Sequence, residues 1–195
     1  MRFELLFLDT VDPSIGRVDH DSFPQQALME MVIEAITNKE AIRGEVEEPN
    51  DIEEWKGVQV EDGEVVKISW RQFKLKGLLH LEWLPSSVTE FIVRWNNFTG
   101  TLDTASLPTS MRRLDLGLNA FTGSLGLERL PEKMEYLGVF GNKLSGSLKL
   151  ESLPDTLIHF VAFKNEFTGC VDLTRLPAAM ENLHLETRIR GRPYV

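Results

Sequence analysis

The chain has 195 residues, 42% of them apolar and 26% charged, which is the composition of a soluble globular protein. No apolar run reaches the ~18 residues that a membrane span needs, so we expect no membrane partner. Residues 1–60 carry 14 acidic and 5 basic side chains, a net charge of −9, which equals the −9 of the whole chain. The remaining residues, 61–195, are therefore neutral. Nucleic-acid-binding surfaces concentrate Lys and Arg, so we expect no nucleic-acid partner.

The compartment is predicted from the cysteine content and the first residues. Cys170 is the only cysteine, which excludes an internal disulfide and favours a reducing, cytoplasmic location. Residues 1–8 are apolar enough to resemble a signal peptide. However, Glu4 interrupts the run, Asp9 ends it, and no small-residue cleavage site follows. If the protein is cytoplasmic, the glycosylation sequon at Asn97 is a by-product of the local sequence pattern.

The first 60 residues are expected to form an amino-terminal cap region. Asp21 or Ser22 can cap a helix whose first turn contains Pro24, and apolar residues at helical spacing then predict a helix over about 23–38. An acidic loop follows over 45–54, and alternation predicts a strand over 63–70. Because a short repeat array needs its open core covered, the helix is assigned that role.

A 23-residue repeat occupies residues 61–195. The dipeptide Leu-Pro recurs at that spacing, at Leu84-Pro85, Leu107-Pro108, Leu130-Pro131, Leu153-Pro154 and Leu176-Pro177. Strict recurrence indicates one supersecondary unit stacked on copies of itself. A degenerate copy lies upstream from Val65, with Phe73 at the position where later copies have asparagine. The last copy loses the pattern at Arg188, which leaves an open sheet edge.

Each position of the repeat has a physical reading. The Leu-x-Leu alternation predicts a short strand with two inward side chains, and stacked copies place these strands in a parallel sheet. The asparagine that follows can satisfy backbone groups at the turn, copy after copy. Behind this asparagine ladder, apolar side chains form a spine, and each is followed two residues later by a glycine. The spine residues are Phe98, Phe121, Leu144 and Phe167.

The pattern Leu-x-x-Leu-x-Leu-x-x-Asn-x-Phe-x-Gly-x-Leu resembles the plant-type leucine-rich repeat, a subclass also seen in single-celled eukaryotes. The resemblance covers about residues 61–187. Residues 55–66 resemble the amino-terminal cap of such arrays, without the cysteine expected near Val60. The family implies an α/β, strand-rich, right-handed solenoid with a parallel concave sheet, and it implies a usual role in binding proteins.

Binding residues are expected among the outward-facing strand positions, since inward positions are committed to packing. Large apolar residues at these positions predict an exposed patch bordered by arginines, as in interaction hot spots. The alternative is that these aromatics pack on each other and stay partly covered. The candidate residues are Arg71, Arg94, Trp95, Arg112, Arg113, Leu118, Tyr136, Phe140, His159, Val161 and Phe163.

Other chemistries are poorly supported. His159, His184 and Glu186 offer too few ligands for a zinc site. The segment 141–147 lacks the Gly-Lys-Ser/Thr ending of a phosphate loop, and 45–54 lacks the spacing of a calcium loop. Cys170 occupies a slot that holds Thr or Ser in other copies. We therefore expect no catalytic residues, no metal and no cofactor.

The sequence predicts a non-enzymatic module that binds a protein or peptide on its concave face. The alternative is an assembly unit that dimerises through its uncapped carboxyl-terminal edge. Either Arg188, Arg190 and Pro193 blunt that edge, or the edge pairs with another chain.

Overall fold

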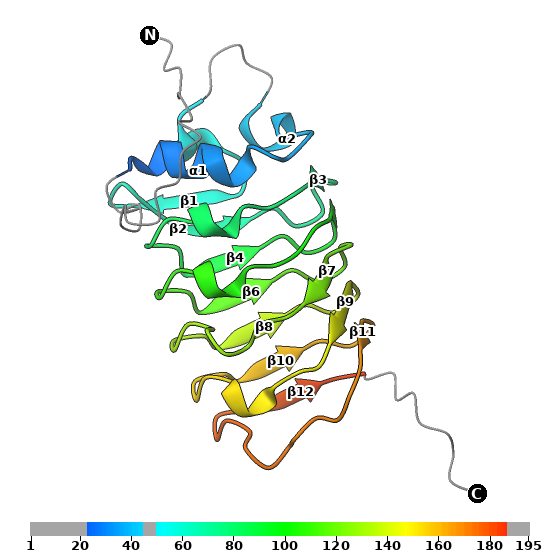
Figure 1. Ribbon diagram of the computed structural model, residues 1–195. Helices are drawn as coiled ribbons and strands as arrows, with labels where there is room; N and C mark the ends of the chain where they lie inside the picture. Colours follow the sequence, from blue (N-terminus) through cyan, green and yellow to red (C-terminus); the bar gives the residue numbers. More distant parts are fainter. Residues whose placement is uncertain (1–22, 45–49, 187–195) are drawn as a thin grey trace, which may run out of the picture.

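The computed structural model describes residues 23–44 and 50–186, in which each repeat forms one coil stacked on the coil before it (Figure 1). Seven strands form one sheet in the order β1-β2-β4-β6-β8-β10-β12, parallel except that β1 pairs antiparallel with β2. The strands are β1 Val58–Glu61, β2 Glu64–Ser69, β4 Glu90–Ile92, β6 Arg113–Asp115, β8 Tyr136–Gly138, β10 His159–Val161 and β12 Asn182–His184. The predicted solenoid with a parallel sheet is confirmed.

The strand register reproduces the 23-residue spacing. Ile68 of the degenerate first copy pairs with Phe91, and Phe91 pairs with Leu114. The same row continues through Phe160 to Leu183. The upstream copy and the truncated last copy are therefore both coils of the sheet, and β2 falls within the strand predicted over 63–70.

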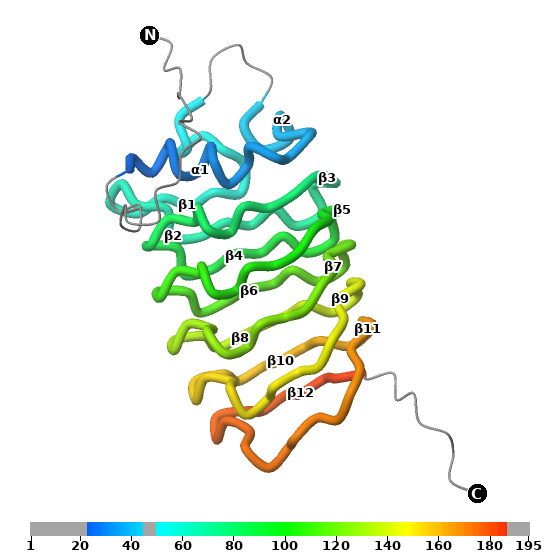
Figure 2. The backbone as a smooth tube through the Cα atoms, in the orientation of Figure 1, coloured from blue at the N-terminus to red at the C-terminus, as the bar shows by residue number. Residues whose placement is uncertain are grey.

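Short strands on the opposite side return the chain, as the tube in Figure 2 shows. β3 (Lys76–Gly77) pairs with β5 (Asn97–Phe98), and β7 (Thr122–Ser124), β9 (Lys143–Gly146) and β11 (Glu166–Phe167) form a three-stranded sheet. Three 3-10 turns lie between the two sides: η3 (Leu81–Trp83), η4 (Thr104–Ser106) and η5 (Leu150–Ser152). The repeat pattern had predicted turns and glycines here, but not these strands.

The predicted asparagine ladder is confirmed. Asn142 accepts a hydrogen bond from the N–H of Phe121 (3.1 Å), and its Nδ2 donates to the carbonyls of Leu116 (3.1 Å) and Val139 (2.9 Å). Asn96, Asn119 and Asn165 repeat this arrangement. The spine behind it is buried, and the rings of Phe98 and Phe121 stack with centroids 6.2 Å apart.

Phe73 departs from the ladder for a physical reason. The side-chain oxygen of each asparagine accepts from the coil before its own, as Asn96 does from the N–H of Leu75 (3.0 Å). Among the described residues, no coil precedes that of Phe73, so its position has no such backbone donor to satisfy. Phe73 instead packs against the core. On the first coil, Asn38 of the cap accepts from the N–H of Lys76 (2.9 Å).

The amino-terminal cap consists of α1 (Gln25–Ile33), α2 (Glu40–Arg43) and η2 (Ile52–Glu54), lying across the first coil (Figure 1). α1 buries Leu28, Met29, Val32 and Ile33, and it shares one core with the repeats. Trp55 and Trp70 are buried, and their indole N–H groups donate to the carbonyls of Asn50 and Lys56. Val60, near which a cap cysteine was expected, pairs with Val65.

The predicted helix over 23–38 is wrong at its carboxyl-terminal end. It stops at Ile33 because the next residues pair with β3: Ile36 forms an antiparallel bridge with Gly77, and Thr37 N–H donates to the Lys76 carbonyl (2.9 Å). A β carbon on Gly77 would lie 2.0 Å from the carbonyl oxygen of Ala35, so the contact requires glycine there. Pairing with the first coil thus overrides helical periodicity.

Several predictions fall outside the described residues. They are the signal-like run over 1–8, the capping role of Asp21 or Ser22, part of the acidic loop (45–49), and the role of Arg188, Arg190 and Pro193 at the edge.

Candidate interaction surface

The outward side of the seven-stranded sheet, which we name the sheet face, carries two rows of stacked side chains. In the first row, the guanidinium carbon of Arg113 lies 3.9 Å from the centre of the Tyr136 ring. Tyr136 meets His159 edge to face (6.1 Å), and His159 Nδ1 lies 2.9 Å from Nδ2 of Asn182. These four residues stand at one register position on successive strands, so the row follows directly from the repeat.

The second row begins at Arg94, whose guanidinium carbon lies 4.7 Å from the centre of the Phe140 ring. Phe140 stacks on Phe163 with 5.2 Å between ring centres and 14° between planes. Phe163 meets His184 edge to face (6.5 Å). Nζ of Lys164 lies 5.8 Å from the same Phe163 ring. Cation–π and ring contacts of this kind order side chains that would otherwise be mobile.

Two glycines make room for these rows. A β carbon on Gly117 would lie 2.4 Å from Cε1 of Phe140, and one on Gly138 would lie 2.8 Å from Cε1 of Tyr136. Both glycines are buried. The two rings therefore cover neighbouring backbone, and they form the floor of the sheet face rather than projecting from it.

Burial corrects part of the predicted patch. Phe140 is only 7% exposed, so the expectation of an exposed ring there is wrong; its partners Arg94 and Phe163 cover it. Tyr136, Leu118, Val161 and Phe163 are half-buried. Trp95 is 54% exposed. The alternative interpretation, in which the aromatics pack against one another, holds for the ring stack of Phe140 and Phe163, whereas Trp95 is largely exposed.

Asp115 is a site residue that the sequence reasoning missed. It is 3% exposed and its carboxylate accepts a hydrogen bond from the N–H of Gly117 (3.2 Å). Burial raises the pKa of this carboxyl, while the charges of Arg94, Arg113 and Arg71 act to lower it. The signal was available, since Asp115 is the one carboxylate among the central outward positions, Ser69, Ile92, Asp115, Gly138, Val161 and His184.

The residues considered for a metal site have other partners. His159 contacts Tyr136 and Asn182, His184 contacts Phe163, and Glu186 accepts a hydrogen bond from the N–H of Lys164 (3.2 Å). Within residues 23–44 and 50–186, no three His, Cys, Asp or Glu side chains converge as metal ligands. In the same part of the chain, no helix is both long and apolar enough to cross a bilayer.

The sequence matches no protein-family model and no curated protein. Solved structures do match the fold. The complex of BIR3 and SERK2 from Arabidopsis thaliana is similar over 85% of this chain and 95% of that chain, with a TM-score of 0.62 and 17% identity. The LRR ectodomain of the receptor kinase GASSHO1/SCHENGEN3 from Arabidopsis thaliana, solved with CASPARIAN STRIP INTEGRITY FACTOR 2, gives a TM-score of 0.69, 19% identity, and covers 85% of this chain and 21% of that one.

A plant ice-binding protein gives a TM-score of 0.70 at 16% identity, over 85% of this chain and 56% of that one. The stacked coils, the asparagine ladder and these similar structures all indicate the same fold. The chain folds as a leucine-rich repeat solenoid.

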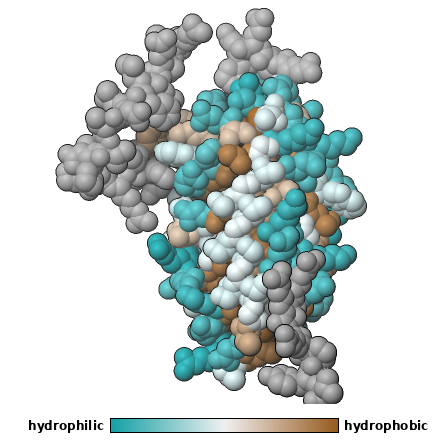
Figure 3. Space-filling model, turned by 45° about the vertical axis from the view of Figure 1, so that its right-hand side comes forward, coloured by the Kyte–Doolittle hydropathy of each residue, from teal (hydrophilic) through white to brown (hydrophobic). Residues whose placement is uncertain are grey.

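The return side of this leucine-rich repeat solenoid carries a second regular surface. Small residues flank a left-handed glycine in four successive coils, at Thr99-Gly100-Thr101, Thr122-Gly123-Ser124, Ser145-Gly146-Ser147 and Thr168-Gly169-Cys170. Figure 3 shows a pale strip of near-neutral hydropathy running down the molecule between hydrophilic flanks. Cys170 is exposed in this stripe, consistent with its reading as a small spacer.

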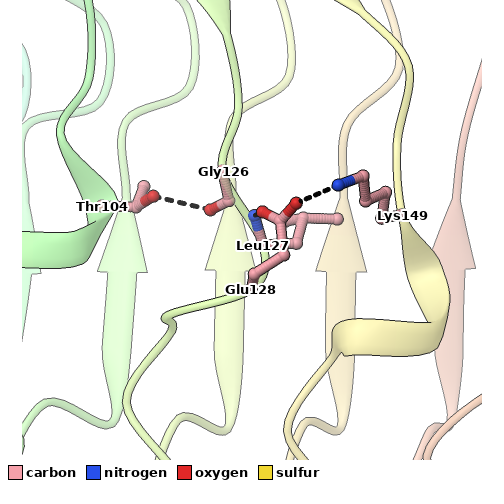
Figure 4. A network of polar contacts seen from close by, with 5 residues as sticks. All are labelled: Thr104, Gly126, Leu127, Glu128 and Lys149. Atoms are coloured by element: carbon pink, nitrogen blue, oxygen red, sulfur yellow. Dashed lines mark hydrogen bonds and ion pairs between the residues drawn. The ribbon is translucent and has the colours of Figure 1, made fainter.

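Polar contacts link neighbouring repeats beside this stripe (Figure 4). The Thr104 hydroxyl donates to the Gly126 carbonyl (2.6 Å), and Lys149 pairs with Glu128 (2.7 Å). The hydrogen bond with Lys149 lowers the pKa of the Glu128 carboxyl, and the same contact raises the pKa of the Lys149 amine. Both side chains are exposed, so solvent screens the pair and it contributes little to stability.

Proposed function

We propose that this leucine-rich repeat protein is a non-enzymatic interaction module that binds a protein or peptide across the sheet face. One observation supports the choice of face: Arg94 and Arg113 stack on the rings of Phe140 and Tyr136, and Trp95, next to Arg94 in sequence, is exposed. Aromatic and arginine side chains held in fixed positions make strong contacts at low entropic cost on binding. The BIR3–SERK2 and GASSHO1/SCHENGEN3 complexes, in which solenoids of this fold contact protein partners, agree with this proposal.

Capture from an extract of the source cells tests the proposal. Bait carrying Trp95→Ser is compared with the unaltered protein, and bound proteins are identified by mass spectrometry. We expect the partner to be lost from the variant, because the exposed indole supplies apolar contact area at the sheet face. Leu173→Ser is the matched control, since Leu173 is equally exposed (55%) but does not belong to the sheet face. Equal capture by both variants would contradict the proposal.

The intracellular location remains part of the proposal. Cys170 is an exposed free thiol, which a reducing compartment preserves. Asn97 and Thr99 of the sequon are both exposed, so the asparagine is accessible to glycosylation in a secretory compartment. A mobility shift of the natural protein on glycosidase treatment, absent in Asn97→Gln, would place it in the secretory pathway instead.

A second candidate is assembly through the carboxyl-terminal edge. Among the described strands, β12 pairs with β10 alone, and Leu183 within it and Met180 and Leu185 beside it in sequence are only half-buried. An open strand edge with apolar neighbours can pair with a second copy. Sedimentation velocity across a hundredfold concentration range decides this. A dimer that dissociates on substitution of Leu183→Lys supports assembly, and a monomer at all concentrations rejects it.

A further inference from the structure

Three arginines on the sheet face surround one buried carboxylate. Arg71 follows β2, Arg94 follows β4 and Arg113 begins β6, so they come from three successive coils. All three act electrostatically on Asp115. Since Asp115 is 3% exposed beneath them, a cationic group from a partner has no path to it. The charge presented to solvent at this place is that of the arginines.

The guanidinium groups have unused hydrogen-bond donors. A guanidinium offers five N–H groups, and stacking on a ring leaves those at its edge free. Within the described residues, the guanidinium groups of Arg71, Arg94 and Arg113 donate no hydrogen bond and form no ion pair. Nε of Arg94 is buried without a partner. The donors that a ligand can reach are therefore the terminal N–H groups of the guanidiniums.

Nearby acidic side chains do not supply this acceptor. Glu90 pairs with Lys67 (2.9 Å), and Glu135 pairs with Arg112 (3.4 Å). Asp115 accepts a hydrogen bond from the Gly117 N–H and pairs with none of the three guanidiniums. Three arginines and one carboxylate sum to two uncompensated positive charges in a region whose other ion pairs are complete.

We propose that the segment bound on the sheet face carries a carboxylate, held by the Arg94 and Arg113 guanidiniums, while Trp95 packs against an apolar neighbour of that group. This inference rests on the proposed function. The fork of N–H donors on arginine matches the two oxygens of a carboxylate. Stacking on Phe140 and Tyr136 fixes the planes of both guanidiniums, so little entropy is lost when the anion binds.

Peptide titrations read by NMR test the inference. The probe is the peptide Leu-Glu-Phe-Glu, acetylated and amidated at its ends, added to protein labelled with ¹⁵N. We expect the Nε–H signals of Arg94 and Arg113 to shift saturably. The matched peptide Leu-Gln-Phe-Gln, blocked in the same way, should leave them unmoved. The same amide peptide, Leu-Gln-Phe-Gln, with a free carboxyl terminus tests whether the bound carboxylate is the chain terminus rather than a glutamate side chain.

Variants separate the role of each charge. We expect Arg94→Gln and Arg113→Gln each to weaken binding of the acidic peptide by about three- to tenfold, because each removes charge-assisted hydrogen bonds. Asp115→Asn should tighten binding, since it removes a repelling carboxylate and keeps an acceptor for the Gly117 N–H. Arg112→Gln is the control, because Arg112 already pairs with Glu135. Arg94→Lys retains charge without the fork and should give intermediate affinity.

Three outcomes would overturn the inference. They are equal binding of the acidic and amide peptides, no loss on either arginine substitution, or the same signal shifts produced by inorganic phosphate at lower concentration than by the peptide. Equal binding of both peptides that still depends on Trp95 would leave the proposed function standing. Failure of Trp95→Ser to affect partner capture would instead reject the proposed function.

Discussion

The ring of Phe140 lies directly on Gly117, so closely that a β carbon on the glycine would be 2.4 Å from Cε1 of the ring. The contact is between consecutive coils, and it decides how the second row of the sheet face is built. With any larger residue at 117, Phe140 must leave the floor, and the Arg94 and Phe163 contacts change with it.

Gly117→Ala should therefore destabilise the protein by about 1–3 kcal/mol through overpacking. Urea unfolding followed by circular dichroism measures the change. The double variant Gly117→Ala with Phe140→Leu is the control, because the smaller side chain leaves space for the new methyl group. If the double variant is no more stable than the single one, the clash with the ring is not the cause.

Asn142→Ala should cost about 1–3 kcal/mol, since it leaves the buried Phe121 N–H without its acceptor. It also removes one of the two amide donors to the carbonyls of Leu116 and Val139, which keep only those from Asn119 and Asn165. Asn97→Ala is a matched control on an exposed residue, with an expected effect within about 0.5 kcal/mol. Chemical denaturation compares the two. If both variants lose a similar free energy of unfolding, the hydrogen bonds of the asparagine ladder do not stabilise the protein as predicted.

Asp115→Asn should raise stability at neutral pH. Burial raises the pKa of the Asp115 carboxyl above its ordinary value of 3.8, so the folded state holds a proton that the unfolded state has released. Stability due to this group consequently falls as pH rises from 3.8 through the raised pKa, and the full cost is present at pH 7. Asparagine carries no such cost.

The measurement is the difference in unfolding free energy between Asp115→Asn and the unaltered protein, from pH 4 to pH 7. The advantage of the variant should grow with pH. An advantage that is constant or shrinks as pH rises would mean that the three arginines, and not burial, dominate the environment of this carboxyl.

Gly141 and Lys164 hold equivalent positions after their strands, with φ of 65° and 54°. Gly141→Ala should lose about 1–2 kcal/mol, because a side chain in the left-handed region is strained, and its β carbon would lie 2.7 Å from Cδ2 of Leu118. Lys164→Gly should instead stabilise the protein, because glycine relieves the backbone strain at this position. The gain is smaller than the loss at Gly141, since glycine loses more conformational entropy on folding. Thermal unfolding of both variants checks the pair; a loss of stability at both positions would reject backbone strain as the cause.

The sequence by itself determined the solenoid. The 23-residue spacing set the register of the sheet, the inward leucines, the asparagine ladder and the apolar spine, because each of these is a local pattern repeated at a fixed period. It also placed the arginines and aromatics on one face, since alternation along a strand decides which side each residue occupies.

Only the tertiary structure decided what those residues do to one another. The helix ends at Ile33 because Ile36 bridges Gly77, 41 residues farther along the chain. Phe140 is buried because the coil before it presents Gly117, and Asp115 lies under three arginines from different coils. These are contacts between side chains of neighbouring repeats, whose direction and depth depend on the residues facing them. A period fixes where such residues stand, but it does not fix which of them remain exposed to a partner.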